Sequence, residues 1–277
     1  MGIDTKPNIT TTGSQMAAAM GFHGPSGAGK TSLATCFPRS VVAMVRDQGL
    51  LPLIDTGMVL PVAHFDPVDS FADLEAKVNW LSGSEHDFRT LVIDGLTGLE
   101  QVLCEHVCDI YFDGSLSNFN AYGRGLEFAV STFSGFLRRL DLLRAKKIVV
   151  VILAHSKVAT FSNPTGADYS RFIPDVKDKL WALLHKWLDL FAFLTFDIEI
   201  KSAAGGKGKA TGGARRVLYT EERPGFVAKN RFGLAFAIQG DGPGGGPLYA
   251  AFAGAMKEAK ARNKQTDPVS LTTGVTS

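Results

Sequence analysis

The residues best suited to chemistry lie in Gly24-Pro-Ser-Gly-Ala-Gly-Lys30-Thr31, which reads glycine, four further residues, then Gly-Lys-Thr. Glycines let a backbone wrap closely around phosphate with its N–H groups pointing inward, and the lysine neutralises phosphate charge. The helical segment that follows adds the positive end of its dipole. The pattern predicts a phosphate-binding loop for a nucleotide. Its residues are Gly24, Pro25, Ser26, Gly27, Ala28, Gly29, Lys30, Thr31 and Ser32.

A magnesium ion is expected beside such a loop, and residue type predicts how it is held. A threonine hydroxyl directly after the lysine binds Mg²⁺, while a carboxylate at the end of a neighbouring strand holds the water shell of the ion. Leu91-Val-Ile is a short apolar, strand-like run that ends at Asp94. We therefore predict that Thr31 ligates Mg²⁺ directly, that Asp94 acts through water, and that Lys30 contacts the β- and γ-phosphates.

The elements that position these residues follow from hydrophobic periodicity. Strand-like apolar runs alternate with segments of helical spacing, which predicts an α/β fold: a mostly parallel sheet with helices on both faces. Two later strand-like segments, joined by a glycine-rich loop at 202–214, predict an antiparallel C-terminal hairpin at one edge. The expected strands are 16–22, 40–45, 91–93, 147–154, 191–201 and 215–220, and the expected helices are 31–37, 71–81, 97–110, 126–145, 174–188 and 248–262.

The composition excludes several classes of protein. The chain has 277 residues, 45% of them hydrophobic, so it is too apolar to be disordered and long enough to bury a core. A net charge of +2 excludes a global attraction to nucleic acid, so any basic site must be local. Three cysteines are too few for a disulfide framework, and no signal peptide or membrane-spanning run is evident. We expect a cytoplasmic protein with no membrane partner.

Four features occur in order along the chain: the loop at 24–31, the strand end at 91–94, His155 after an apolar run, and Lys229-Asn-Arg231-Phe-Gly233. Together they resemble the RecA-like P-loop ATPase core. More closely, the chain is similar to phage-encoded nucleotide-binding proteins that act as RecA-like single-strand annealing recombinases. The resemblance covers residues 16–240 and implies that they form a RecA-like ATPase domain. The residues outside it predict a flexible N-terminal arm at 1–15 and a C-terminal helix and polar tail at 241–277.

The same resemblance implies roles in catalysis. Asp94 matches the acid beside Mg²⁺, and His155 matches a polar sensor of the γ-phosphate. Lys229 and Arg231 match a pair that reaches the nucleotide of a neighbouring subunit. Such a pair implies a homo-oligomer, either a ring or a filament, with ATP bound between its subunits.

The chain departs from this family at one catalytic position. The glutamate that commonly polarises the attacking water is replaced by the segment Val45-Arg-Asp47-Gln48-Gly. The Asp47 carboxylate has a shorter reach, and the Gln48 amide can orient water but cannot accept its proton. Hydrolysis is therefore expected to be slow unless another group acts as the base.

The function implied by the resemblance is ATP-dependent binding and annealing of single-stranded DNA during phage recombination, in the host cytoplasm. The cofactors would be ATP and Mg²⁺, and a single-strand DNA-binding protein is a further candidate partner. The polar stretches 113–124 and 156–172 fall where RecA-like proteins carry DNA-facing loops, and they contain aromatic residues such as Phe119 and Phe161 that suit base stacking. Residues 201–231 carry eight basic and two acidic side chains, which suits contact with a phosphate backbone.

Simpler explanations exist for several of these features. His155 could be a histidine at the edge of the core, Lys229 and Arg231 could lie on a solvated strand face, and the basic segment could be a solubilising hairpin tip. A helicase-type motor or loader, a small-molecule phosphotransferase, and a nucleotide-gated binding module with negligible turnover all use the same kind of loop. Strand unwinding would indicate the motor, and a metabolite-dependent yield of ADP would indicate the phosphotransferase.

Overall fold

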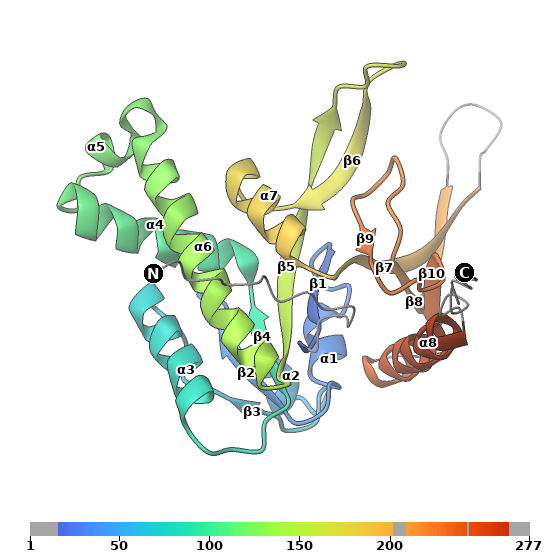
Figure 1. Ribbon diagram of the computed structural model, residues 1–277. Coiled ribbons are helices and arrows are strands. Elements are labelled where there is room, and N and C mark those ends of the chain that lie inside the picture. Colours follow the sequence, from blue (N-terminus) through green and yellow to red (C-terminus); the bar gives the residue numbers. More distant parts are fainter. Residues whose placement is uncertain (1–15, 202–208, 243, 266–277) are drawn as a thin grey trace, which may run out of the picture.

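The computed structural model describes residues 16–201, 209–242 and 244–265 (Figure 1). Its centre is a 10-stranded sheet with the strand order β10-β8-β7-β1-β5-β4-β2-β3, while β6 pairs with β5 and β9 with β7 beside this path. The predicted arm at 1–15, the tip of the glycine-rich loop at 202–208 and the polar tail from 266 lie outside the described residues. The strands are β1 (Ala19–Gly24), β2 (Ser40–Met44), β3 (Ala63–His64), β4 (Thr90–Asp94), β5 (Val149–Phe161), β6 (Tyr169–Pro174), β7 (Leu190–Lys201), β8 (Lys209–Tyr219), β9 (Lys229–Asn230) and β10 (Ala237–Gly240).

The direction of the strands agrees with the prediction. β1 pairs in parallel with β5 and β7, β4 with β5 and β2, and β2 with β3. β8 and β10 add antiparallel pairs beyond β7. The predicted α/β fold, a mostly parallel sheet with an antiparallel C-terminal hairpin, is confirmed.

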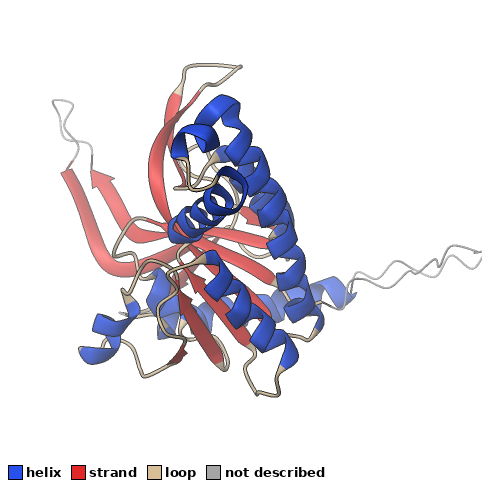
Figure 2. Ribbon diagram, turned by 90° about the vertical axis from the view of Figure 1, so that its left-hand side faces the viewer, coloured by secondary structure: helices blue, strands red, loops and turns tan. Residues whose placement is uncertain are grey.

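Helices cover both faces of the sheet (Figure 2). Alternate residues of β5 show the two layers, because Val150 and Ile152 belong to one buried cluster and Val151 and Leu153 to the other. A continuous apolar run of this kind is typical of a parallel strand that is buried on both sides. The first cluster includes residues of α3, α4, α6 and α7, and the second includes residues of α1, α2 and α8. The helices are α1 (Lys30–Ala34), α2 (Leu50–Asp55), α3 (Phe71–Gly83), α4 (Leu96–Phe112), α5 (Leu116–Asn120), the 3₁₀ helix η1 (Ala121–Gly123), α6 (Arg124–Ala145), α7 (Asp178–Trp187) and α8 (Gly246–Gln265).

Two stretches that were expected to be polar loops have regular structure. The strand predicted at 147–154 continues as β5 and pairs with β6, so residues 156–172 lie in an antiparallel hairpin that projects from the sheet (Figure 1). Residues 113–124 include α5 and η1. The helix predicted to start at Pro174 begins at Asp178, because Pro174 is the last residue of the edge strand β6, where proline is tolerated.

Candidate nucleotide-binding site

The predicted site residues meet at the carboxyl edge of the parallel strands. Strand pairing places Gly24, the last residue of β1, beside His155 of β5. In the same way Asp94, the last residue of β4, pairs with Leu153 of β5 and Met44 of β2. The loops after parallel strands meet at this edge, which is where open α/β sheets bind ligands.

The phosphate-binding loop has the backbone conformation that its glycines predict. Gly27 and Gly29 have positive φ angles of 77° and 98°, which residues with side chains rarely adopt. A side chain at Gly24 would collide with the carbonyl oxygen of Leu194 on the adjacent strand β7. Glycine is therefore required by conformation within the loop and by close packing at its start.

Lys30 is held inside this loop. Its side chain is buried, and its ammonium group donates hydrogen bonds of 3.0 Å to the carbonyl oxygens of Gly24 and Pro25. Burial lowers the pKa of Lys30, while the charges of Asp94 and Asp47 raise it. The cation therefore lies among groups of the loop, where it can meet the negative charge of a phosphate.

Thr31 and Asp94, the two residues predicted to hold Mg²⁺, are in contact with each other. The Thr31 hydroxyl donates a hydrogen bond of 2.7 Å to Asp94 Oδ2. Burial raises the pKa of the Asp94 carboxyl, and the hydrogen bond from Thr31 opposes this shift. A hydroxyl and a carboxylate that face each other are oxygen donors of the kind that Mg²⁺ prefers, so the residues fit this ion. Thr31 would hold it directly and Asp94 through water.

Asp47 and His155 lie beside this pair. Asp47 Oδ2 is 3.7 Å from His155 Nε2, and Asp47 Oδ1 accepts a hydrogen bond of 2.9 Å from the backbone N–H of Gly49. The negative charge of Asp47 also raises the pKa of both Lys30 and Asp94. The structure thus joins Asp47 and His155 to the loop and its acidic partner. Asp47 is a carboxylate in this group that could accept a proton from water.

Lys229 and Arg231 lie away from this cluster. Lys229 begins β9, which pairs with the start of β7, towards the amino ends of the parallel strands. Its ammonium group donates hydrogen bonds to the backbone carbonyls of His185 and Lys186 in the last turn of α7. Arg231 Nη1 is 3.6 Å from Asp189 Oδ1. Within one chain the two cations compensate a helix C-terminus and a carboxylate.

Several side chains that were expected to face DNA make contacts within the chain. Phe119 is 8% exposed and packs against Phe112 and Gly125, so the predicted stacking role of Phe119 is wrong. From the basic segment, Arg223 lies over an aromatic ring and Arg216 binds the phosphate-binding loop. The loop partner of Arg216 lies 188 residues away in sequence, and the composition of the segments revealed none of these contacts.

One further residue of the site was not predicted. His23 lies in the buried strand β1, and its Nδ1 and Nε2 are each 2.8 Å from a partner, Ser156 Oγ and the Val227 carbonyl oxygen. Burial lowers the pKa of His23 to about 3, so the ring is neutral. Because a carbonyl can only accept, Nε2 carries the proton and Nδ1 accepts a hydrogen bond from Ser156. The only sequence signal is a polar residue within the apolar run before the loop.

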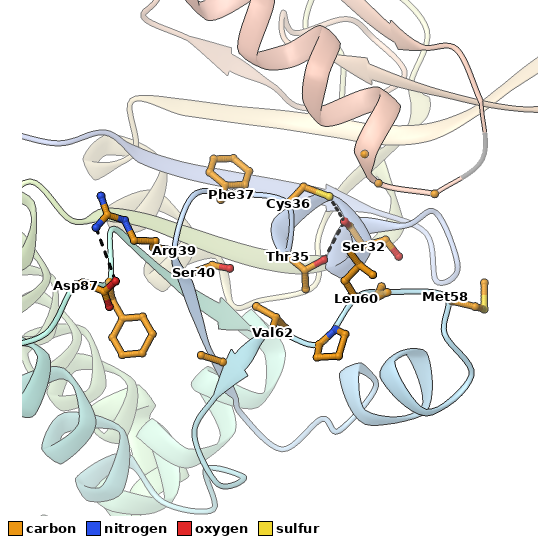
Figure 3. Close-up of a pocket in the computed structure, with 17 residues that line it drawn as sticks. Ser32, Thr35, Cys36, Phe37, Arg39, Ser40, Met58, Leu60, Val62 and Asp87 are labelled. Carbon is orange, nitrogen blue, oxygen red and sulfur yellow. Dashed lines mark hydrogen bonds and ion pairs between the residues drawn. The ribbon is translucent and has the colours of Figure 1, made fainter.

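A cavity of about 600 Å³ adjoins the helix that follows the loop (Figure 3). Ser32 of α1 and Thr35, which directly follows this helix, line one side of it, and segment 58–63 lines another. Gly244–Gly246 also contribute to the lining. Leu60 and Val62 give the cavity an apolar component that suits a planar ring. Ser32 joins the cavity to the loop, whereas Arg39, Ser40 and Asp87 at its other end lie at the amino ends of β2 and β4, away from Asp94.

Comparison with known proteins adds a family to this geometry. A family profile described as an AAA domain matches residues 16–232, a range that includes the loop, Asp94, His155 and the Lys229–Arg231 pair. The chain belongs to the AAA domain family. It is therefore a P-loop ATPase domain, and such domains bind nucleotide, usually together with Mg²⁺.

Comparisons with solved structures and with curated proteins add no further family. One solved structure that matches this AAA-family chain is the flagellar accessory protein FlaH from Methanocaldococcus jannaschii. The two share 8% sequence identity with a TM-score of 0.40, and the match covers 85% of this chain and 89% of that chain. No curated protein matches the chain. Within the part of the chain that the structure describes, no helix is both long and apolar enough to cross a membrane.

Proposed function

We propose that this ATPase binds and anneals single-stranded DNA, and that ATP in the loop controls the β5–β6 hairpin as a DNA-contacting element. The observation that carries the proposal is the continuity of β5. This strand passes the nucleotide site at His155 and runs without a break to Phe161 in the projecting hairpin (Figure 1). A shift of β5 at the nucleotide edge would therefore move the hairpin directly.

Both strands of the hairpin are attached at their base to elements of the nucleotide site. Ser156 donates a hydrogen bond of 2.8 Å to His23, the residue before the loop begins at Gly24. Asp175, directly after β6, accepts through its backbone carbonyl a hydrogen bond of 2.8 Å from the hydroxyl of Thr97. Thr97 lies in the first turn of α4, which follows Asp94. The hairpin is thus hydrogen-bonded to His23, which precedes the loop, and to Thr97, which follows Asp94 by three residues.

The hairpin carries side chains that suit contact with unpaired bases. Val158 is 61% exposed and Phe161 is 38% exposed. Phe161 and Tyr169 face each other with ring centroids 5.2 Å apart, and the Arg171 guanidinium lies over the Phe161 ring. Exposed aromatic rings bind single strands with little sequence preference because every base has a face on which to stack.

The position of Lys229 and Arg231 favours an oligomer of identical chains. Both lie towards the amino ends of the strands, whereas the loop of the same chain lies at the carboxyl edge. A nucleotide that they contact would therefore belong to a neighbouring copy. The carbonyl oxygens at the end of α7 would then be exchanged for phosphate oxygens. An arginine that acts in this way contributes several orders of magnitude to hydrolysis in other P-loop ATPases.

Hydrolysis would use the side chains grouped at the sheet edge. Lys30 would bind the β- and γ-phosphates, and Thr31 and Asp94 would hold Mg²⁺, which would neutralise phosphate charge. Asp47 accepts a proton from the attacking water, and His155, 3.7 Å from Asp47, senses the γ-phosphate. Turnover is slow because the Asp47 side chain is shorter than the glutamate it replaces.

Fluorescence anisotropy of a labelled single-stranded oligonucleotide, with and without Mg-ATP, tests the proposal. We expect tight binding only with Mg-ATP, and about tenfold weaker binding by Phe161→Ala, the size of one lost stacking contact. Trp80→Ala is the matched control, because Trp80 is 45% exposed and lies on α3 rather than on the hairpin. The proposal would be contradicted if oligonucleotide affinity were the same with and without Mg-ATP, or the same in Phe161→Ala and the wild type. Strand unwinding by the protein would indicate a motor instead.

A further inference from the structure

Arg216 of β8 is fixed against the phosphate-binding loop of its own chain. Its Nε donates a hydrogen bond of 2.9 Å to the Ala28 carbonyl oxygen, and its Nη1 donates one of 2.9 Å to the Gly244 carbonyl oxygen. The guanidinium carbon is 5.6 Å from the centroid of the Phe196 ring. A Cβ atom at Gly29 would lie 2.6 Å from Arg216 Nε. The side chain and the loop are therefore in direct contact.

The contact with Ala28 involves a peptide group that bears on phosphate binding. The Ala28 carbonyl and the Gly29 N–H belong to one trans peptide, so they point in opposite directions. A guanidinium bound to the carbonyl fixes the direction of this N–H and polarises it as a donor. Backbone N–H groups are what a loop of this type offers to phosphate oxygens.

The second contact joins the loop to the turn before α8. Gly244 and Gly245 immediately precede α8, which begins at Gly246. Gly245 lies so close to the backbone carbonyl of Ser32 in α1 that any side chain there would collide with it. Arg216 therefore connects the loop with a turn that packs on the helix following the loop.

We propose that Arg216 is a positioning residue for phosphate binding that acts through the Ala28–Gly29 peptide. The inference rests on the proposed nucleotide site, and it adds a cation of the same chain that holds the loop in place. The adjacent residue Arg215 provides a matched control. Arg215 lies beside the irregularity in the pairing of β7 with β8, and it is exposed, whereas Arg216 is partly buried against the loop.

The test is the dissociation constant of Mg-ADP for the full-length chain, combined with urea unfolding of the nucleotide-free protein. We expect Arg216→Ala to weaken Mg-ADP binding by about tenfold or more, the effect of one lost charge-assisted hydrogen bond. Arg216→Lys keeps the charge but not the forked geometry, so its affinity should be intermediate. Arg215→Ala should bind within about twofold of the wild type, as expected of an exposed residue. Lys30→Ala should not bind Mg-ADP.

A position-216 variant that is less stable in urea but binds Mg-ADP with wild-type affinity has lost only a structural contact, and this result overturns the proposal. An equal loss in Arg215→Ala also overturns it, because the effect would then be one of general charge. If Arg216→Ala does not fold, Arg216→Lys decides: weaker binding supports the proposal and wild-type binding overturns it. If the wild-type chain binds no Mg-ADP, the nucleotide site itself fails and the inference fails with it, which distinguishes the two.

Discussion

Two groups of charged side chains lie towards opposite ends of the parallel strands, and their charges are balanced in different ways. At the carboxyl edge, Lys30 and Asp94 are buried, and burial shifts the pKa of each towards its neutral form. Towards the amino ends, Asp189 accepts a hydrogen bond of 3.0 Å from the Ala19 N–H and one of 2.6 Å from Arg144. The first group holds charge that burial disfavours, whereas the second uses its charges to join elements of the fold.

The charges at the carboxyl edge are suited to binding a ligand, whereas those towards the amino ends stabilise the chain. Buried groups with shifted pKa values cluster at functional sites, and a bound phosphate with Mg²⁺ would compensate them. Charges that are paired with an opposite charge, as Asp189 is with Arg144, should affect stability first when they are removed. Within one chain Lys229 and Arg231 belong to the second group by their contacts with the end of α7 and with Asp189, although burial lowers the pKa of Lys229 as it does that of Lys30. They would join the first group only in an oligomer.

The largest expected effect is at the carboxyl edge. Asp94→Asn should lower the rate of ATP hydrolysis by about a hundredfold or more, because the carboxylate that holds the Mg²⁺ water shell is lost. The nucleotide-free variant should be at least as stable as the wild type, because burial of a carboxylate costs free energy. Steady-state ATPase assays and urea unfolding measure the two quantities. If this variant hydrolyses ATP at the wild-type rate, the proposed role of Asp94 in holding Mg²⁺ is contradicted.

Arg231→Ala should reduce ATP hydrolysis by about a hundredfold or more without weakening Mg-ADP binding, if Arg231 acts on a neighbouring subunit. A mixing experiment makes this specific. Lys30→Ala lacks a working loop but retains Arg231, so adding it to Arg231→Ala should restore part of the activity at shared interfaces. A mixture that is no more active than its components would assign Arg231 to the structural group.

The comparison itself is tested by a pair of charge-removing variants. Asp189→Asn should lower the free energy of unfolding by about 2 kcal/mol, because the Arg144 guanidinium loses its charged partner. Asp94→Asn should not lower it. Both values come from urea unfolding of the nucleotide-free chain at the same pH. If both variants lose the same free energy of unfolding, the charges of the two regions contribute to stability in the same way and the comparison fails.

A smaller effect is expected at His23. Its pKa is about 3 in the folded chain against an ordinary value of 6.5, so between these values the unfolded chain binds the extra proton. The free energy of unfolding should therefore fall as the pH is lowered below 6.5, by about 1 kcal/mol between pH 7.5 and pH 5.5 from this group. His23→Gln keeps an amide donor for the Val227 carbonyl and does not titrate. The variant should lose this part of the pH dependence, and an unchanged pH profile would contradict the assignment of a neutral buried ring.

Motifs with fixed geometry explain what could be predicted from the sequence. A glycine-rich loop after a strand has little conformational freedom, and an acid at a neighbouring strand end must lie at the same edge. For this reason Thr31 and Asp94 could be paired in advance, and the structure places their oxygens 2.7 Å apart. The fold could be predicted because apolar runs such as 148–154 are typical of buried parallel strands. The catalytic roles of Asp47 and His155 stay predictions.

Contacts that depend on strand register could not be predicted. Arg215 and Arg216 are neighbours in a basic segment, and a shift of β8 by one residue would exchange their faces. The partners of His23 lie 133 and 204 residues further along the chain, so no local pattern reveals them. The β5–β6 hairpin was predicted as a loop because its polar residues, exposed beyond the sheet, do not show the apolar pattern of a buried strand.

The most direct test of the account is the rate of ATP hydrolysis by the full chain with and without single-stranded DNA. Lys30→Ala serves as the control for contaminating ATPases. We predict a slow basal rate that rises several-fold with single-stranded DNA and is lost in the variant. A rate that depends on Lys30 but does not respond to single strands of any length would contradict the role of the hairpin and of DNA.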